Sequence, residues 1–329
     1  MLFTYKTGAF LSQAPNSYTR EMSEKKAYVF KFNAYGSPVV AGGASHRLDI
    51  NDIFTDIHSL DIVKSDTTGR ILICRDEVDS DPLFIRVIDN DKTKRIVSGV
   101  FYSIKSKNLP DQFDPVTGLI SPLSISRDLL DKTHFLIDTS NCMLVIHRSK
   151  SSPSTGLLAY YITEKLNKTV NALSIDVHFR KGVLEKIEKK SSKNKIKFFE
   201  MKIKKTALVR AHLLGNDARQ ALESLSKLSG ADSIGISISL EKYHSKGGFN
   251  IDELLGNIKK FLGMEISDKP LSDVEEAKVK AGDEVINLLS SKFSISFDVP
   301  SNVMSARNVD SKAVLNLIYN EYLSRKADL

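Results

Sequence analysis

Only two cysteines occur among the 329 residues. Cys74 and Cys142 are too few for the disulfide framework that stabilises small secreted proteins. Both lie inside apolar runs, ILICRDEV and SNCMLVIH. Unpaired cysteine is among the residue types most often buried. We therefore expect two buried, reduced thiols, as is usual in a cytoplasmic protein.

Long apolar runs are also absent. No stretch approaches the ~18 consecutive apolar residues that a membrane-spanning helix needs. The first residues, MLFTYKTGAFLSQ, lack the basic start and long apolar stretch of a signal peptide. We expect a soluble, cytoplasmic chain that is not itself a membrane protein.

The motifs of common cofactor and metal sites are missing as well. Neither the seven histidines nor the cysteines have the spacing of metal ligands. The segment GSPVVAGGAS is rich in glycine but lacks the GxxxxGK[ST] pattern of a phosphate-binding loop. We expect no metal ion and no cofactor, and the sequence favours a binding protein over an enzyme.

The composition is that of a folded protein, with 41% hydrophobic and 26% charged residues. The chain length suits two domains of ~150 residues each. Strand-like and helix-like segments follow one another without a steady βαβ alternation, which favours an α+β fold with mixed or antiparallel sheets flanked by helices. We expect two lobes, residues 1–214 and residues 215–329.

Hydrophobic periodicity predicts the individual elements. Strands are expected at 27–35, 70–76, 83–89, 94–106, 134–149 (a hairpin), 173–180, 196–205, 231–243, 272–279 and 292–300. Helices are expected at 50–60, 151–168, 181–190, 215–230, 249–264 and at the C-terminal DSKAVLNLIYNEYLSRK, with a further helical turn at DEVINLL. Residues 1–26 and 108–122 are expected to be irregular.

Positive charge is concentrated in one segment. Residues 180–210 contain twelve Lys/Arg and three Asp/Glu, a net charge of +9, whereas the rest of the chain has 35 basic and 37 acidic residues. A basic cluster on a near-neutral background is typical of a protein that binds a polyanion. The candidate nucleic-acid-binding residues are Arg180, Lys181, Lys186, Lys189, Lys190, Lys193, Lys195, Lys197, Lys202, Lys204, Lys205 and Arg210.

No helix-turn-helix, zinc-finger or RNA-recognition signature accompanies this segment. We therefore expect DNA binding that reads phosphates rather than base edges. Two alternatives stay open at this point. The lysines could protect an edge strand at 196–205 from aggregation, or the strand could belong to a scaffold that binds an acidic protein.

A catalytic alternative lies in the same segment. Glu200 and Lys202 form an E-x-K pair on a predicted strand, and Asp176 lies on the strand before it. Two carboxylates and a lysine in this order could hold Mg²⁺ beside a phosphate, as in a metal-dependent nuclease. E-x-K is frequent wherever lysines are dense, so a structural role competes with this hypothesis.

The order of segments resembles the RexA-like family of phage-exclusion proteins. The resemblance covers residues 70–329 and lies in HFLIDTSNCMLVIHRSKSSPSTGLLAYYITEKL, in DVHFRKGVLEK followed by IKFFEMKIKKTALV, in GADSIGISISLEK and in FNIDELLGNIKKFLG. It implies a homodimer that binds DNA without sequence preference, acts as a sensor or regulator in anti-phage defence, and works with a membrane-effector partner. KwaB-like defence proteins of similar size likewise bind DNA and pair with membrane subunits.

The C-terminal lobe is the expected dimer surface. Its strand 231–243 alternates strictly, and helix 249–264 carries an apolar stripe that is wide enough to be buried. Packing of that stripe on its own sheet is the alternative. A two-fold axis would present the basic segment twice to one DNA molecule.

Overall fold

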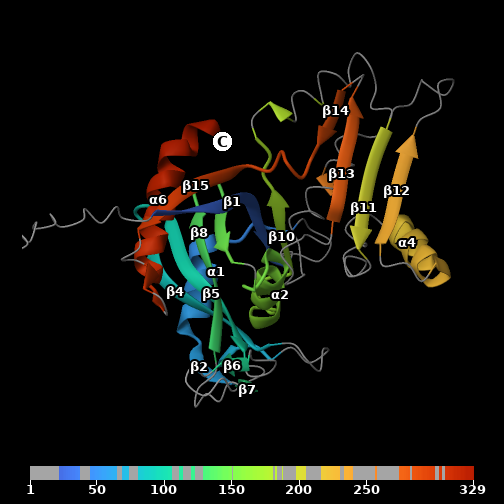
Figure 1. The fold of residues 1–329 in the computed structure, drawn as a ribbon. Helices are drawn as coiled ribbons and strands as arrows, with labels where there is room; N and C mark the ends of the chain where they lie inside the picture. Colours follow the sequence, from blue (N-terminus) through green and yellow to red (C-terminus); the bar gives the residue numbers. More distant parts are fainter. Residues whose placement is uncertain are drawn as a thin grey trace, which may run out of the picture.

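The computed structural model describes most of the two sheets and their helices. The described residues are 22–37, 45–64, 69–73, 81–105, 111–113, 120–122, 129–149, 151–180, 182–183, 187, 198–204, 216–229, 233–239, 256–257, 274–281, 284–300, 304–305 and 308–329. They form an α+β fold with a large and a small antiparallel sheet (Figure 1). None of the helices in these ranges is long and apolar enough to cross a membrane.

The large sheet has seven strands. Its order is β10-β1-β9-β8-β5-β4, and β15 also pairs with β1. All of its pairings are antiparallel. The strands are β1 (Met22–Tyr35), β4 (Leu83–Asp91), β5 (Ile96–Lys105), β8 (Leu129–Asp138), β9 (Met143–Arg148), β10 (Ala172–Val177) and β15 (Ser294–Pro300).

Helices cover both faces of the large sheet, because successive strand residues point to opposite sides. On one face, Val29 and Val145 pack with Ile318 and Tyr322 of α6 (Ser311–Arg325). On the other face, strand residues such as Phe32 and Phe135 belong to the larger cluster, which also contains buried residues of α1 (Ile50–Ser59) and α2 (Thr155–Lys165).

Side-chain caps fix where these helices begin. Asp49 accepts a hydrogen bond from the amide of Asn51 at the start of α1, and Ser154 accepts one from Leu157 in α2. Asp310 accepts hydrogen bonds from the amides of Lys312 and Ala313 in α6. These short polar residues satisfy amides that have no partner inside the helix, so the sequence specifies each start locally.

The small sheet has the order β12-β11-β13-β14. Its strands are β11 (Phe198–Lys204), β12 (Ser233–Ser239), β13 (Val274–Ala281) and β14 (Glu284–Asn287), and α4 (Asn216–Ser229) contacts β12. Phe199, Met201 and Ile203 point to the buried side of β11 and belong to the same apolar cluster as residues of the large sheet. Figure 1 shows the small sheet beside the large one.

The small sheet is an insertion between two strands that share one edge of β1. β10 pairs with the second half of β1, and β15 pairs with the first half. The exchange occurs at Val29, whose amide donates to Phe293 and whose carbonyl accepts from His178. The chain leaves at Arg180 and returns at Ser291, where the Arg180 amide donates to the Ser291 carbonyl oxygen over 2.9 Å. We call this crossing point the neck.

Short pairings complete the described structure. They are parallel β2 (Asp61–Lys64) with β3 (Gly69–Ile71), antiparallel β6 (Asp111–Phe113) with β7 (Ile120–Pro122), antiparallel β16 (Met304–Ser305) with β17 (Asn308–Val309), and the 3-10 turn η2 (Lys326–Asp328).

Three local predictions are wrong. DEVINLL contains strand β14 rather than a helical turn, because it pairs with β13. Residues 22–26 are not irregular, because β15 extends β1 in that direction. The predicted loop 108–122 contains the short hairpin of β6 and β7.

Two further observations concern the expected division into lobes and the position of the basic strand in its sheet. β11 precedes residue 214, but its partners β12 and β13 follow that residue, so a division at 214 cuts through the small sheet. Of the expected C-terminal lobe, β15 is a strand of the large sheet and α6 packs on that sheet. β11 is flanked on both sides, so the alternative of an edge strand at 196–205 is wrong.

Candidate nucleic-acid interface

The basic segment starts at the neck and continues into the second strand of the small sheet. Val183 and Ile187 have helical backbone and Ile187 is fully buried, whereas most of the predicted helix 181–190 lies outside the described residues. Arg180 and Lys202 are exposed, and the backbone of Lys204 lies in β11. The other candidate residues lie outside the described residues: Lys181, Lys186, Lys189, Lys190, Lys193, Lys195, Lys197, Lys205 and Arg210.

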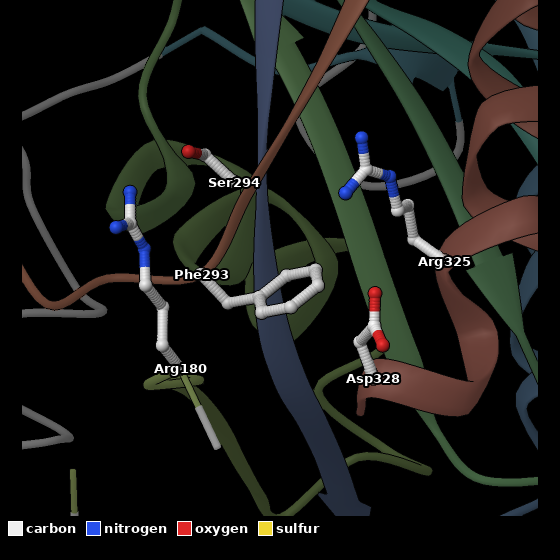
Figure 2. A pocket seen from close by; sticks show the side chains of 5 residues that line it. All are labelled: Arg180, Phe293, Ser294, Arg325 and Asp328. Atoms are coloured by element: carbon white, nitrogen blue, oxygen red, sulfur yellow. The ribbon is translucent and has the colours of Figure 1, made fainter. Parts of the chain in front are cut away.

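Arg180 lines an open pocket of about 420 Å³ at the neck. The other lining residues are Phe293 and Ser294 at the start of β15, and Arg325 and Asp328 at the end of α6 (Figure 2). The Arg180 and Arg325 side chains lie on either side of the Phe293 ring (Figure 2). The pocket therefore combines two guanidinium groups, an aromatic ring and one carboxylate.

Backbone pairing holds the parts of this neck pocket in place. The Phe293 amide donates to the His178 carbonyl over 2.7 Å, directly beside the hydrogen bond that joins Arg180 to Ser291. The Phe293 ring meets the His178 ring edge to face, with centroids 6.1 Å apart. Phe293 is 9% exposed, so the ring is mostly a wall of the pocket rather than a protruding side chain.

The two arginines differ in what they already contact. Nε of Arg325 lies 3.2 Å from a carboxylate oxygen of Glu321, one helical turn earlier in α6. Such exposed pairs contribute little to stability and exchange readily with other anions. Arg180 makes no ion pair with any residue in the described part of the chain, so its charge is available to a ligand.

The E-x-K pair has oppositely charged residues opposite it across the sheet. In the register of β11 and β13, Lys278 lies opposite Glu200 and Glu276 lies opposite Lys202. Opposite charges in such positions stabilise an antiparallel pair. Lys278 thus provides a structural reason for Glu200 that requires no metal ion.

Asp176 lies in a different sheet from Glu200 and Lys202. It is on β10, opposite Lys31 of β1, and one of its oxygens accepts a hydrogen bond from the Asn33 amide group over 3.3 Å. The three residues of the nuclease hypothesis are therefore not on neighbouring strands. Within the described ranges, no group of three or more His, Cys, Asp or Glu side chains could hold a metal ion.

Other residues considered from the sequence occupy structural positions. Cys142 is a buried free thiol, and Cys74 lies outside the described residues. His134 and His147 lie opposite each other on β8 and β9 with ring centroids 6.0 Å apart. Of the proposed dimer surface, β12 is paired with β11 alone in the described structure, and only residues 256–257 of the predicted helix 249–264 are described.

Sequence reasoning did not identify Phe293, Arg325 or Asp328. They are more than a hundred residues from Arg180 in the chain and belong to no motif. Only the arrangement of β10 and β15 along β1, with α6 packed on β15, brings them to Arg180. No signal in a single sequence could have indicated this.

No protein-family model matches the chain, and no curated protein shows significant sequence similarity to it.

Proposed function

We propose that this protein binds DNA without sequence preference and acts as a sensor or regulator in defence against infecting phage. The observation that carries the DNA-binding proposal is the net charge of +9 in residues 180–210 on a chain that is otherwise close to neutral. The role in defence rests on the resemblance to RexA-like proteins, which also implies a homodimer and a membrane-effector partner.

The neck pocket supports this proposal because it places one further cation, Arg325, beside the first residue of the basic segment. Arg180 is the first residue of the segment, and Arg325 of α6 lies across the Phe293 ring from it. Guanidinium groups bind phosphate oxygens through paired hydrogen bonds. Lys202, which is exposed on β11, is a further described cation of the segment.

The nuclease alternative finds less support. Glu200 and Lys202 have oppositely charged residues opposite them in β13, and Asp176 belongs to the large sheet. A scaffold that binds an acidic protein would use the same basic segment. A binding assay with DNA distinguishes the scaffold from the DNA-binding protein. Phosphate recognition releases counterions, so DNA binding should depend steeply on salt and be independent of sequence.

A gel-shift assay with plasmid DNA, with and without Mg²⁺, tests the proposal. We expect retarded plasmid in both conditions and no cleavage. Replacement of Arg180 and Arg325 by Ala should weaken binding several-fold, since each lost phosphate contact removes about one released counterion. The matched control is Arg86→Ala with Arg219→Ala, which removes two exposed arginines elsewhere.

Two results would contradict the proposal. One is a wild-type protein that leaves the plasmid unshifted at low salt. The other is Mg²⁺-dependent cleavage that Glu200→Ala abolishes, which would establish the nuclease instead. The defence role is tested by the plating efficiency of phages on cells with and without the protein, and equal efficiency for every phage would argue against that role.

A further inference from the structure

A second pocket, of about 570 Å³, lies at the large sheet. Three chain segments meet there: residues 47–51, which lead into α1; the β4–β5 turn with Lys92 and Arg95; and the β8–β9 turn at residues 139–142. None of these segments belongs to the neck or to residues 180–210. We call it the turn pocket.

Three cationic side chains line the turn pocket: Arg47, Lys92 and Arg95. Arg47 donates to the Asn33 side-chain oxygen over 3.0 Å, and Lys92 lies 3.1 Å from a carboxylate oxygen of Asp52. Among the described residues, no carboxylate forms an ion pair with the Arg47 or Arg95 guanidinium. Neither guanidinium is neutralised by an ion pair, and although the Asp49 carboxylate also lines the pocket, the lining keeps a net positive charge.

The one carboxylate that lines the pocket is already engaged. Asp49 accepts the amide hydrogen of Asn51 over 2.7 Å as the N-cap of α1. This bond also occupies an amide at the start of the helix. The cationic side chains are therefore the main groups that could hold an anionic ligand here.

The β8–β9 turn supplies a polar wall fixed to the β4–β5 turn. The Thr139 amide donates to the Arg95 carbonyl over 2.8 Å, and the Thr139 hydroxyl donates to the same oxygen over 3.2 Å. The Ser140 hydroxyl donates to Asp138. Since these hydroxyl hydrogens are in use, the donors left for a ligand are the three cations.

The remaining wall is apolar and comes from Leu48, Ile50 and Cys142. Ile50 and Cys142 are buried, at 4% and 8% exposed. The pocket therefore has a cationic side and an apolar side. Its volume is within the range of about 300 to 1,000 Å³ that is typical of small-molecule sites.

We propose that the turn pocket binds a nucleotide-sized phosphate ester. Arg47 and Arg95 hold the phosphate group through charge-assisted hydrogen bonds, with Lys92 beside them. Leu48, Ile50 and Cys142 contact the less polar part of the ligand. This site is separate from the proposed DNA contact in both its residues and its ligand.

Isothermal titration calorimetry on the full chain tests this inference. The probes are adenosine, guanosine, cytidine and uridine monophosphates, inorganic phosphate, and adenosine as the uncharged control. We expect at least one monophosphate to bind, to bind more tightly than inorganic phosphate, and to raise the melting temperature, while adenosine does not bind. Arg47→Ala with Arg95→Ala should weaken that binding by about tenfold or more, the usual effect of losing a charge-assisted hydrogen bond.

Lys94→Ala is the matched control. Lys94 belongs to the same turn as Arg95 but pairs with Asp91 at 3.2 Å and does not line the pocket. Its variant should bind the monophosphate like the wild type. The double arginine variant should keep the cooperative melting of the wild type, which shows that it folds.

Three results would overturn the inference. The first is that none of the four monophosphates binds the wild type. The second is equal affinity in the double arginine variant. The third is that this variant loses duplex DNA binding in proportion to monophosphate binding, which would make the pocket a contact for the DNA backbone. We expect its affinity for duplex DNA to stay within about twofold of the wild type, because one exposed contact contributes little to a distributed interface.

Discussion

At the scale of single residues, His134 connects the large sheet to α6. It is 4% exposed on β8, and its Nε2 lies 3.1 Å from the Ser311 hydroxyl oxygen at the start of α6. Burial lowers the pKa of His134 to about 3, and the nearby charges of His147 and Lys132 act in the same direction. The folded protein therefore holds this imidazole in its neutral form.

The pKa of His134 predicts a loss of stability in acid. The unfolded chain takes up a proton at an ordinary histidine pKa of 6.5, whereas the folded chain resists it down to about 3. The full stability contribution is present above 6.5 and declines as the pH falls below that value. Burial also lowers the pKa of His147, which adds an effect of the same sign.

We expect His134→Gln to reduce this pH dependence. Between about pH 7 and about pH 4.5, the free energy of unfolding of the wild type should fall by roughly 2 kcal/mol more than that of the variant. Chemical denaturation at both pH values measures this. His58→Gln, at an exposed histidine, is the control and should behave like the wild type. Equal acid sensitivity of all three proteins would contradict the role assigned to His134.

The residue scale also shows what a single sequence can indicate about a site. Residue type and local density drew attention to Arg180 and Lys202, which the structure shows to be exposed, while their role in DNA binding stays a prediction. The same reasoning grouped Asp176 with Glu200, although β10 and β11 belong to different sheets. Proximity between strands depends on pairings that are not encoded in the spacing of the residues.

At the scale of elements, helices with local start signals were predictable. The periodicity at 50–60 gave α1, and the Ser-Pro start at 151–168 gave α2 with Ser154 as its cap. The hairpin at 134–149 was predicted correctly as β8 and β9. In each of these elements the deciding contacts lie within a few residues, so a short window of sequence contains the signal.

Elements that depend on distant partners were not predictable. Residues 22–26 are a strand only because β15, almost three hundred residues later, pairs with them. DEVINLL has a helical apolar spacing, but its pairing with β13 makes it β14. Tertiary context overrides local preference in both segments.

Two glycines inside strands give a matched pair of stability predictions. A Cβ atom on Gly99 of β5 would lie 2.7 Å from the Arg86 carbonyl oxygen and 2.7 Å from the Phe135 ring, whereas one on Gly235 of β12 would meet nothing within 4 Å. We expect Gly99→Ala to lower the free energy of unfolding by about 1–3 kcal/mol through overpacking. Gly235→Ala should be close to neutral. Denaturant titration of both variants checks this, and equal stability would contradict the packing described for β5.

A rescue experiment tests whether the opposite charges of Glu200 and Lys278 stabilise the pairing of β11 with β13. Glu200→Lys places two lysines opposite each other and should destabilise the protein by about 0.2–1 kcal/mol. Adding Lys278→Glu restores an opposite-charge pair and should recover most of that loss. A metal site at Glu200 would not be restored by the second change, so failure of the rescue would weaken the structural explanation of the E-x-K pair.

At the scale of the whole molecule, the small sheet is inserted into the large one at the neck. This topology explains why residue 214 does not separate the lobes and why the neck pocket joins residues 180, 293 and 325. It also determines which fragments of the chain keep the strand pairings of both sheets. A chain that ends near Ser229 would lose β12 and β13, which flank β11, and also β15 and α6. Loss of DNA binding in such a fragment would report on folding rather than on oligomerisation.

The homodimer stays a prediction, and it requires the full chain for its test. If a two-fold axis doubles the basic surface, light scattering at micromolar concentration should give twice the mass of 36.6 kDa. Dilution into the monomeric range should then weaken DNA binding as well. A monomer at all concentrations with unchanged DNA affinity would remove the dimer from the mechanism.

The salt dependence of DNA binding tests the central proposal most directly. Fluorescence anisotropy with two duplexes of equal length and unrelated sequence should give similar affinities for both. The affinities should fall steeply between about 50 and about 200 mM salt, because each phosphate contact releases condensed counterions. Replacing Lys189, Lys190, Lys193 and Lys195 by Ala should weaken binding to both duplexes and flatten the salt slope.

The control removes the same charge from exposed lysines elsewhere, with Lys26, Lys94, Lys168 and Lys312 replaced by Ala. This variant should lose much less affinity, since its lysines lie outside residues 180–210. Equal losses in the two quadruple variants would mean that net charge alone drives binding. Unchanged affinity in the variant of the basic segment, or strong preference for one duplex, would contradict sequence-independent DNA binding through residues 180–210.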